Sequence, residues 1–156
     1  MSLFTNPNRI PENYGIRVAV GLIVYFFAMK FAHLTHVVEL RLLNLVILIL
    51  GIYLALKKFK SSHEKHLNYF RALSTGVTTG AIASLIFGLF LFIWLNIDPD
   101  MMHAIEEHDP MGRFLNPYIA AFIVALEGVF SGLLVTFILI NYITTDEVND
   151  PIDKKL

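Results

Sequence analysis

Four long apolar stretches constrain this chain more than any other feature. They cover residues 18–38, 40–56, 73–97 and 117–143. An α-helix needs about 20 apolar residues to cross the hydrocarbon core of a bilayer. The mean hydropathy of +0.62 agrees, and only 16% of the residues are charged, against about 25% in a typical soluble domain. The sequence therefore predicts an all-α, integral membrane four-helix bundle with antiparallel neighbours, in one membrane domain of residues 1–156.

The second stretch is the shortest, because its uninterrupted run from Leu42 to Leu56 has only fifteen residues. A buried helix of a soluble protein could have this length, but the neighbouring stretches favour a span. Arg41 and Lys57 flank the run and can extend their charged ends toward the headgroups.

Basic residues fall mainly on one side of the predicted spans. With alternating spans, the N-terminus, the loop 57–71 and the C-terminus share one side with nine basic residues, and the other side has two. Cytoplasmic loops carry an excess of Lys and Arg, so the sequence predicts an N-in/C-in topology with both termini cytoplasmic. The nine residues are Arg9, Arg17, Lys57, Lys58, Lys60, Lys65, Arg71, Lys154 and Lys155, and the two are Arg41 and Arg113.

Several function classes are disfavoured by what the sequence lacks. It has no cysteine, which removes disulfides, thiol catalysis and thiolate metal sites. A net charge of -1 gives no general basis for nucleic-acid binding. No pairing of a nucleophile with a base is recognisable. We therefore expect no enzymatic activity, no cofactor and no nucleic-acid partner.

Two ionisable residues fall inside the predicted spans, Lys30 in the first and Glu127 in the fourth. Counting helical rises from the outer ends of the spans places Lys30 about 13 Å and Glu127 about 15 Å deep. Charges inside a span are costly and normally face a partner or a cavity. We therefore predict that Lys30 and Glu127 form an intramembrane ion pair, with the first and fourth spans as neighbours. The pair would be a fixed structural contact, which we prefer, or a proton- or ion-linked switch.

Polar residues gather at the predicted outer ends of the spans and in the outer loop 98–116. They form either a shallow aqueous vestibule or the ordinary polarity of helix ends, which we prefer. His33 and His36 share a helical face, as metal ligands would, but no HExxH motif or cysteine accompanies them, and we predict no metal site. In the loop, Asp98 followed by Pro99 predicts the start of a short helix. The members of the predicted outer polar cluster are His33, His36, Asn44 and Asn96.

Small residues recur every four positions along the third stretch, and a shorter version occurs in the fourth. Such a ridge allows the backbones of two membrane helices to approach closely. The pattern predicts either packing between the third and fourth spans, which we prefer, or a contact surface for another protein. The residues are Gly76, Gly80, Ser84 and Gly88 in the third stretch, and Gly128 and Gly132 in the fourth.

Four short segments carry a resemblance to known proteins. They read YGIRVAVG, LNYFRALSTG, FIWLNIDPDMM and LNPYIAAFIVALEGVFSGLL. Over roughly residues 12–145 the chain resembles the bacterial, largely Bacteroidetes, four-helix membrane family catalogued as domain of unknown function 4199. The resemblance implies a location in the bacterial inner (cytoplasmic) membrane and supplies no catalytic or binding residue.

We predict that the chain is a non-enzymatic accessory or scaffold component of the membrane. Its partners would be the lipid bilayer and either a second copy, as a homo-oligomer, or another membrane protein. The alternative is a small oligomeric transporter or ion-coupled permease that uses the Lys30–Glu127 pair. Neutral replacements of the pair would leave a scaffold functional, whereas they would remove the ion dependence of a transporter.

Overall fold

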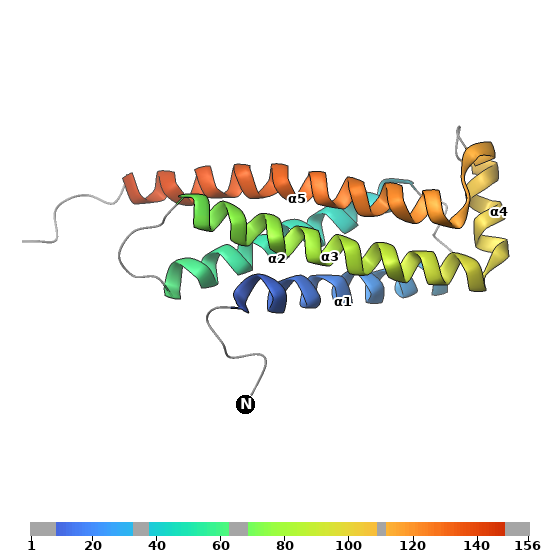
Figure 1. Cartoon of the computed structure of the whole chain (residues 1–156), viewed down its shortest axis with the longest axis horizontal. Helices are drawn as coiled ribbons and strands as arrows, with labels where there is room; N and C mark the ends of the chain where they lie inside the picture. Colours follow the sequence, from blue (N-terminus) through green and yellow to red (C-terminus); the bar gives the residue numbers. More distant parts are fainter. Residues whose placement is uncertain (1–8, 33–37, 63–68, 109–111, 149–156) are drawn as a thin grey trace, which may run out of the picture.

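Four long helices run side by side, and a shorter helix lies across one end of them (Figure 1). The computed structural model describes residues 9–32, 38–62, 69–108 and 112–148. No strand occurs within these ranges, so the predicted all-α class is confirmed. The long helices are α1 (Ile10–Phe31), α2 (Val38–Ser62), α3 (Tyr69–Ile97) and α5 (Pro117–Val148), and the shorter elements are α4 (Pro99–His108) and the 3-10 helix η2 (Gly112–Phe114).

The four long helices are also apolar enough to cross a membrane. A helix satisfies its backbone hydrogen bonds internally, which is what a segment in hydrocarbon requires. Large apolar side chains on all four of these helices, such as Val24, Leu50, Leu89 and Phe130, are more than half exposed, as lipid-facing residues would be. The chain is therefore a helical membrane bundle with several spans.

The first helix is displaced along the sequence from the predicted span 18–38. It begins at Ile10 and ends at Phe31. Pro11 lies in its first turn, where the missing N–H leaves no intrahelical hydrogen bond unmade, and Glu12 is favourable near the positive end of the helix dipole. Hydropathy alone missed this start because the first turns are polar.

The second helix extends beyond the predicted span 40–56 and takes in the first residues of the predicted loop 57–71. α2 ends only at Ser62. The hydroxyl groups of Ser61 and Ser62 both donate to the carbonyl of Lys58, at 2.9 and 3.0 Å. These bonds satisfy a carbonyl in the last turn, where helical N–H partners run out.

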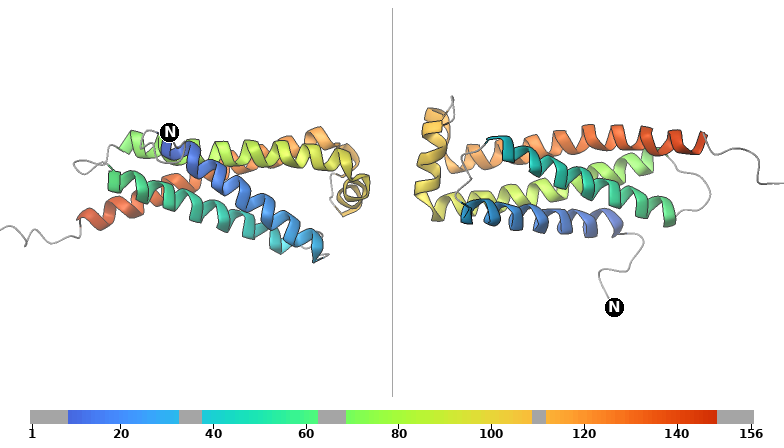
Figure 2. Two further views of the ribbon diagram at one scale, coloured as in Figure 1. Left: turned by 90° about the horizontal axis from the view of Figure 1, so that it is seen from below. Right: turned by 180° about the vertical axis from the view of Figure 1, so that it is seen from behind.

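The third long helix is the centre of the bundle. α3 contacts α1, α2 and α5, and α2 also contacts α1 and α5. α3 runs antiparallel to α2 and α5 and parallel to α1, so not all packed neighbours are antiparallel. α1 and α5 form opposite flanks of the molecule (Figure 2). The prediction that the first and fourth spans are packed neighbours is therefore wrong.

The best-covered residues lie where α2, α3 and α5 meet. Ile52, Thr79, Thr136 and Ile140 have no exposed surface. The two threonine hydroxyls are satisfied within their own helices, because each donates to the carbonyl four residues earlier, at 2.7 and 2.6 Å. These two buried hydroxyl groups therefore need no water.

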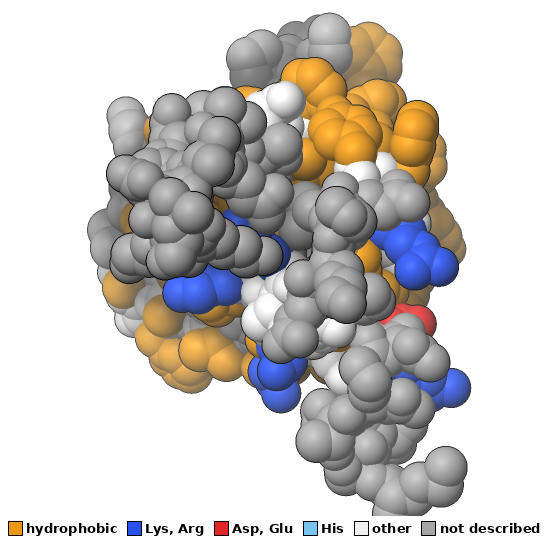
Figure 3. Space-filling view, turned by 90° about the vertical axis from the view of Figure 1, so that its left-hand side faces the viewer, with side chains coloured by type: hydrophobic (Ala, Val, Ile, Leu, Met, Phe, Trp, Pro, Cys, Tyr) orange, Lys and Arg blue, Asp and Glu red, His pale blue; other side chains and the backbone are white. Residues whose placement is uncertain are grey.

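The two ends of the bundle differ in charge. α1 begins and α5 ends at one end, which we call the basic end, and Figure 3 looks onto it. The opposite end carries α4, and we call it the α4 end. Described basic side chains at the basic end are Arg9, Lys57, Lys58, Lys60 and Arg71, and described acidic ones at the α4 end are Asp98, Asp100, Glu106 and Glu107.

Candidate functional site

An ion pair ties α1 to the corner between α3 and α4. Lys30 lies in the last turn of α1, and its Nζ donates to Oδ2 of Asp98. The same ammonium lies 4.3 Å from the ring centroid of Trp94, in a cation–π contact. The side chains of Lys30 and Asp98 are 38% and 21% exposed. The lysine thus holds three elements together at the α4 end.

Asp98 also begins α4. The hydrogen bond from Lys30 holds the pKa of the Asp98 carboxyl below its ordinary value of 3.8, and it outweighs the partial burial that would raise the pKa. The backbone N–H of Met101 adds a further hydrogen bond to the carboxylate, as expected of a residue that caps a helix N-terminus. The predicted short helix that starts after Asp98 is confirmed, since α4 begins at Pro99.

Aromatic rings fill the contact between α1 and α3 next to this ion pair. Phe26 and Phe27 each meet Phe90 and Trp94 at large angles between the ring planes, with centroid distances of 5.1 to 5.9 Å. Edge-to-face pairs of this kind contribute about 0.5–1.5 kcal/mol beyond their buried area. They fix the height of α1 on α3, and with it the position of Lys30.

The predicted ion pair between Lys30 and Glu127 is wrong. The prediction measured depth from Glu39, whereas α1 ends at Phe31. Lys30 is therefore near the end of its helix, beside Asp98. Glu127 belongs to α5, which lies across α3 from α1.

Glu127 projects from the exposed face of α5. It is ten residues from Pro117, the first residue of the helix, which places it about 15 Å along the helix axis. Its neighbours Ile123 and Phe130 are 47% and 60% exposed. Glu127 forms no ion pair or hydrogen bond with any residue that the structure describes. A carboxyl group without a described partner therefore lies on an exposed apolar face, near the middle of the candidate span Pro117–Ile143.

Arg17 is a second intramembrane charge, which the sequence analysis placed at the cytoplasmic boundary. Two residues before it, Gly15 packs against Thr79 and Ile82 of α3, and the middle of α3 is at residue 83. Arg17 is exposed, and its guanidinium lies 5.3 Å from the ring centroid of Tyr14. The signal was missed because the predicted span began at Val18, whereas the helix begins at Ile10.

The small residues of α3 and α5 face each other inside the molecule. A Cβ placed on Gly80 would lie 3.1 Å from the Cα of Gly132, and one on Gly88 would lie 2.7 Å from the Cβ of Ala125. Between them, the Ser84 side chain packs on Gly128 in the same way, and Gly76 faces Thr136. These residues form packing within one chain, which leaves other faces available for contact with other proteins.

The outer polar cluster is only partly described. The exposed Asn96 donates its amide to the Phe92 carbonyl of its own helix at 2.7 Å. Asn44 has a buried side-chain oxygen without a hydrogen-bond partner among the described residues. His33 and His36 lie outside the described residues, so the vestibule stays a prediction. Within the described part of the chain, no group of three or more His, Cys, Asp or Glu residues could hold a metal ion.

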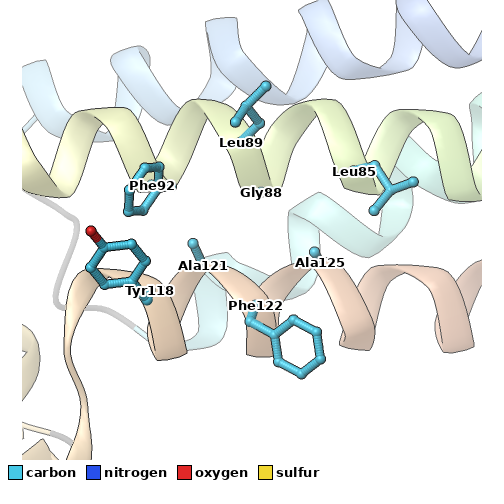
Figure 4. Close-up of a pocket in the computed structure, with 8 residues that line it drawn as sticks. All are labelled: Leu85, Gly88, Leu89, Phe92, Tyr118, Ala121, Phe122 and Ala125. Atoms are coloured by element: carbon cyan, nitrogen blue, oxygen red, sulfur yellow. The ribbon is translucent and has the colours of Figure 1, made fainter.

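A shallow groove of about 290 Å³ runs between α3 and α5 toward the α4 end (Figure 4). Gly88, Ala121 and Ala125 line part of it, and the rings of Phe92 and Tyr118 lie at one end, with centroids 4.7 Å apart. Its lining is apolar except for the phenol of Tyr118. The lining residues are Leu85, Gly88, Leu89, Phe92, Tyr118, Ala121, Phe122 and Ala125.

The ion pair between Lys30 and Asp98 should make the stability of the protein depend on pH in acid. Because the pKa of Asp98 is lowered in the folded chain, its contribution is present above the unfolded pKa of about 3.9 and is lost as the pH falls through the lower folded value. The melting temperature in detergent should therefore fall as the pH drops below about 4. In Asp98→Asn this particular acid dependence should be smaller. An equal fall in both proteins would show that Asp98 is not responsible.

Membrane proteins with several α-helical spans are the class that this fold and its close-packed helices define. The chain belongs to the family described as "Protein of unknown function (DUF4199)", whose model matches residues 13–109 of the 156, so the predicted resemblance is confirmed. The match reaches from α1 to α4 and ends before α5, the helix that carries Glu127. No curated protein and no solved structure matched the chain.

Proposed function

We propose that the chain is a non-enzymatic accessory or scaffold component of a bacterial inner membrane, which works by lateral contact with other membrane helices. The observation that carries this proposal is Glu127, an exposed carboxyl group on α5 without a described partner.

The energetic argument concerns what surrounds this carboxyl group. Ionisable residues within spans are costly and almost always face a bundle interior, a water-filled cavity or a partner. Glu127 faces away from α3, and the apolar groove between α3 and α5 is lined by other residues. A contact with another helix would cover the group and remove most of this cost.

The orientation follows from charge. The basic end carries Lys57, Lys58 and Lys60 on α2 with Arg71 on α3, and the positive-inside rule assigns such an end to the cytoplasm. We therefore propose that both termini are cytoplasmic and that α4 lies on the outer side.

The transporter alternative loses the feature on which it was based. Lys30 is held by Asp98 and Trp94 near the end of α1, so it does not share a mid-membrane site with Glu127. Without that pair, the described residues favour a role in contact over a role in translocation.

Native electrophoresis of gently solubilised membranes tests the proposal. Wild-type chain should migrate in a complex larger than the 17.7 kDa monomer. Glu127→Leu should reduce the share of chain in that complex about three- to tenfold, in line with the strength of polar contacts between membrane helices. Leu50→Ala, at a 56% exposed position of α2, is the control and should have no effect. Unchanged migration of the Glu127 variant would refute a contact through this face.

A further inference from the structure

We infer that the partner at Glu127 is a second copy of this chain, which presents Arg17 of its α1. The inference rests on the proposed lateral contact and specifies its partner. The two charges would meet where α5 of one copy packs against α1 of the next.

The two charges lie at nearly the same position along the bundle axis, as their packing contacts with α3 show. Gly128 packs on Ser84, so Glu127, one residue nearer the α4 end, is level with Leu85. Gly15 packs between Thr79 and Ile82, so Arg17 is level with Ala83. Two residues of helix correspond to about 3 Å. An arginine side chain can span that offset, so two copies in the same membrane orientation can bring the charges together.

Both charges belong to exposed apolar faces. On α1, Val20 and Val24 follow Arg17 at three and seven residues and are 54% and 62% exposed. On α5, Ile123 and Leu134 lie four residues before and seven after Glu127 and are 47% and 61% exposed. Spacings of three, four and seven residues place side chains on one side of a helix, as in antiparallel helix packing.

The pairing is also favoured by the charges that the chain has available. Lys30 is already bound to Asp98, and Lys57 and Arg71 lie toward the basic end. Arg17 forms no ion pair with a described acidic residue. A two-fold contact between two α5 faces would instead set one Glu127 beside another, which gives no charge complementarity.

The geometry of the fold makes this contact head-to-tail. Because α1 and α5 form opposite flanks (Figure 2), each copy can offer α5 to one neighbour and α1 to another. Contacts of this kind are heterologous and generate a ring if they close and a row if they do not.

Disulfide crosslinking in liposomes tests the arrangement. The sequence has no cysteine, so only the introduced cysteines can form disulfides. On this scale along α3, Val24 is level with Phe90 and Ile123 with Leu89, and they belong to α1 and α5, which form opposite flanks of one chain. Purified Val24→Cys and Ile123→Cys chains should therefore crosslink when mixed. Neither should form dimers alone, and a chain with both cysteines should form a ladder of multimers. Efficient dimers of Ile123→Cys alone would overturn the head-to-tail arrangement in favour of a two-fold contact.

Charge variants in the same mixture test the ion pair. Arg17→Gln and Glu127→Gln should each lower the yield of mixed dimers about three- to tenfold, and Arg17→Lys should retain most of it. Arg17→Glu combined with Glu127→Arg should restore the yield. Because both side chains are exposed, the melting temperature of each purified variant in detergent should match that of the wild type. Undiminished crosslinking in both glutamine variants would overturn the role of the pair.

The outcome can be separated from that of the proposed function. If purified copies fail to crosslink while Glu127→Leu still disrupts the native complex, the second copy is excluded and the lateral contact stands with a different protein. If the native complex is also unaffected, both proposals fail.

Discussion

Leucine in place of Gly80 should lower the melting temperature of the purified protein strongly. A Cβ at this position would already lie 3.1 Å from the Cα of Gly132, and the remaining leucine atoms would have to enter the same contact. Backbone cannot move aside as a side chain can, so α3 and α5 would have to separate. Overpacking of this kind costs about 1–3 kcal/mol, and we expect the upper end.

Gly21→Leu is the matched control, because it makes the same chemical change in a helix with more space. A Cβ on Gly21 would meet only the side chain of Ile47, at 3.5 Å. Both substitutions raise helix propensity, so the difference between their melting curves in one detergent reports the clash at Gly80. Equal melting temperatures would show that the small-residue contact does not hold α3 and α5 together.

Truncation of Ile52 to alanine should produce the second large effect. This side chain has no exposed surface, and its Cδ1 lies beside the contact between Gly80 and Gly132. The loss would leave a cavity where α2, α3 and α5 meet. Buried Ile→Ala changes in soluble proteins cost about 2–5 kcal/mol. We expect about 2 kcal/mol here, because separated helices meet lipid that is as apolar as the core, so the transfer part is small.

Leu54→Ala measures the same kind of change on the other side of α2. Leu54 is 49% exposed. Denaturation in mixed micelles should therefore show a much smaller shift of the unfolding midpoint for Leu54→Ala than for Ile52→Ala. If the two alanine variants unfold alike, Ile52 does not occupy a close-packed position.

The apolar runs of the sequence were enough to predict a helical membrane protein, because the bilayer admits few alternatives. Helix ends were harder to place. α1 begins with Pro11 and Glu12, which are favourable at a helix start but lower the local hydropathy. The displacement of this one helix had the largest consequence, since it moved Lys30 from the interior to the membrane boundary and Arg17 in the opposite direction.

Neighbour relations between helices were beyond what the sequence could show. Depth along each helix suggested that Lys30 and Glu127 could meet, but depth does not say which helices are adjacent. The ridge of Gly76, Gly80 and Gly88 indicated a close contact, and its partner on α5 became clear only from the packed structure. The sequence indicated Asp98 only as the residue that begins α4, although its carboxylate also forms an ion pair with Lys30.

The central position of α3 bears on how the protein is made. Ribosomal synthesis delivers α1 and α2 before α3 exists, and both of them pack against it in the finished bundle. The first hairpin must therefore wait in the membrane with one side uncovered, and membrane chaperones or lipids would have to shield it. A nascent chain arrested before Tyr69 should accordingly be degraded faster than one arrested after Ile97. Protection from proteolysis would thus begin when α3 inserts, because the other long helices pack against it.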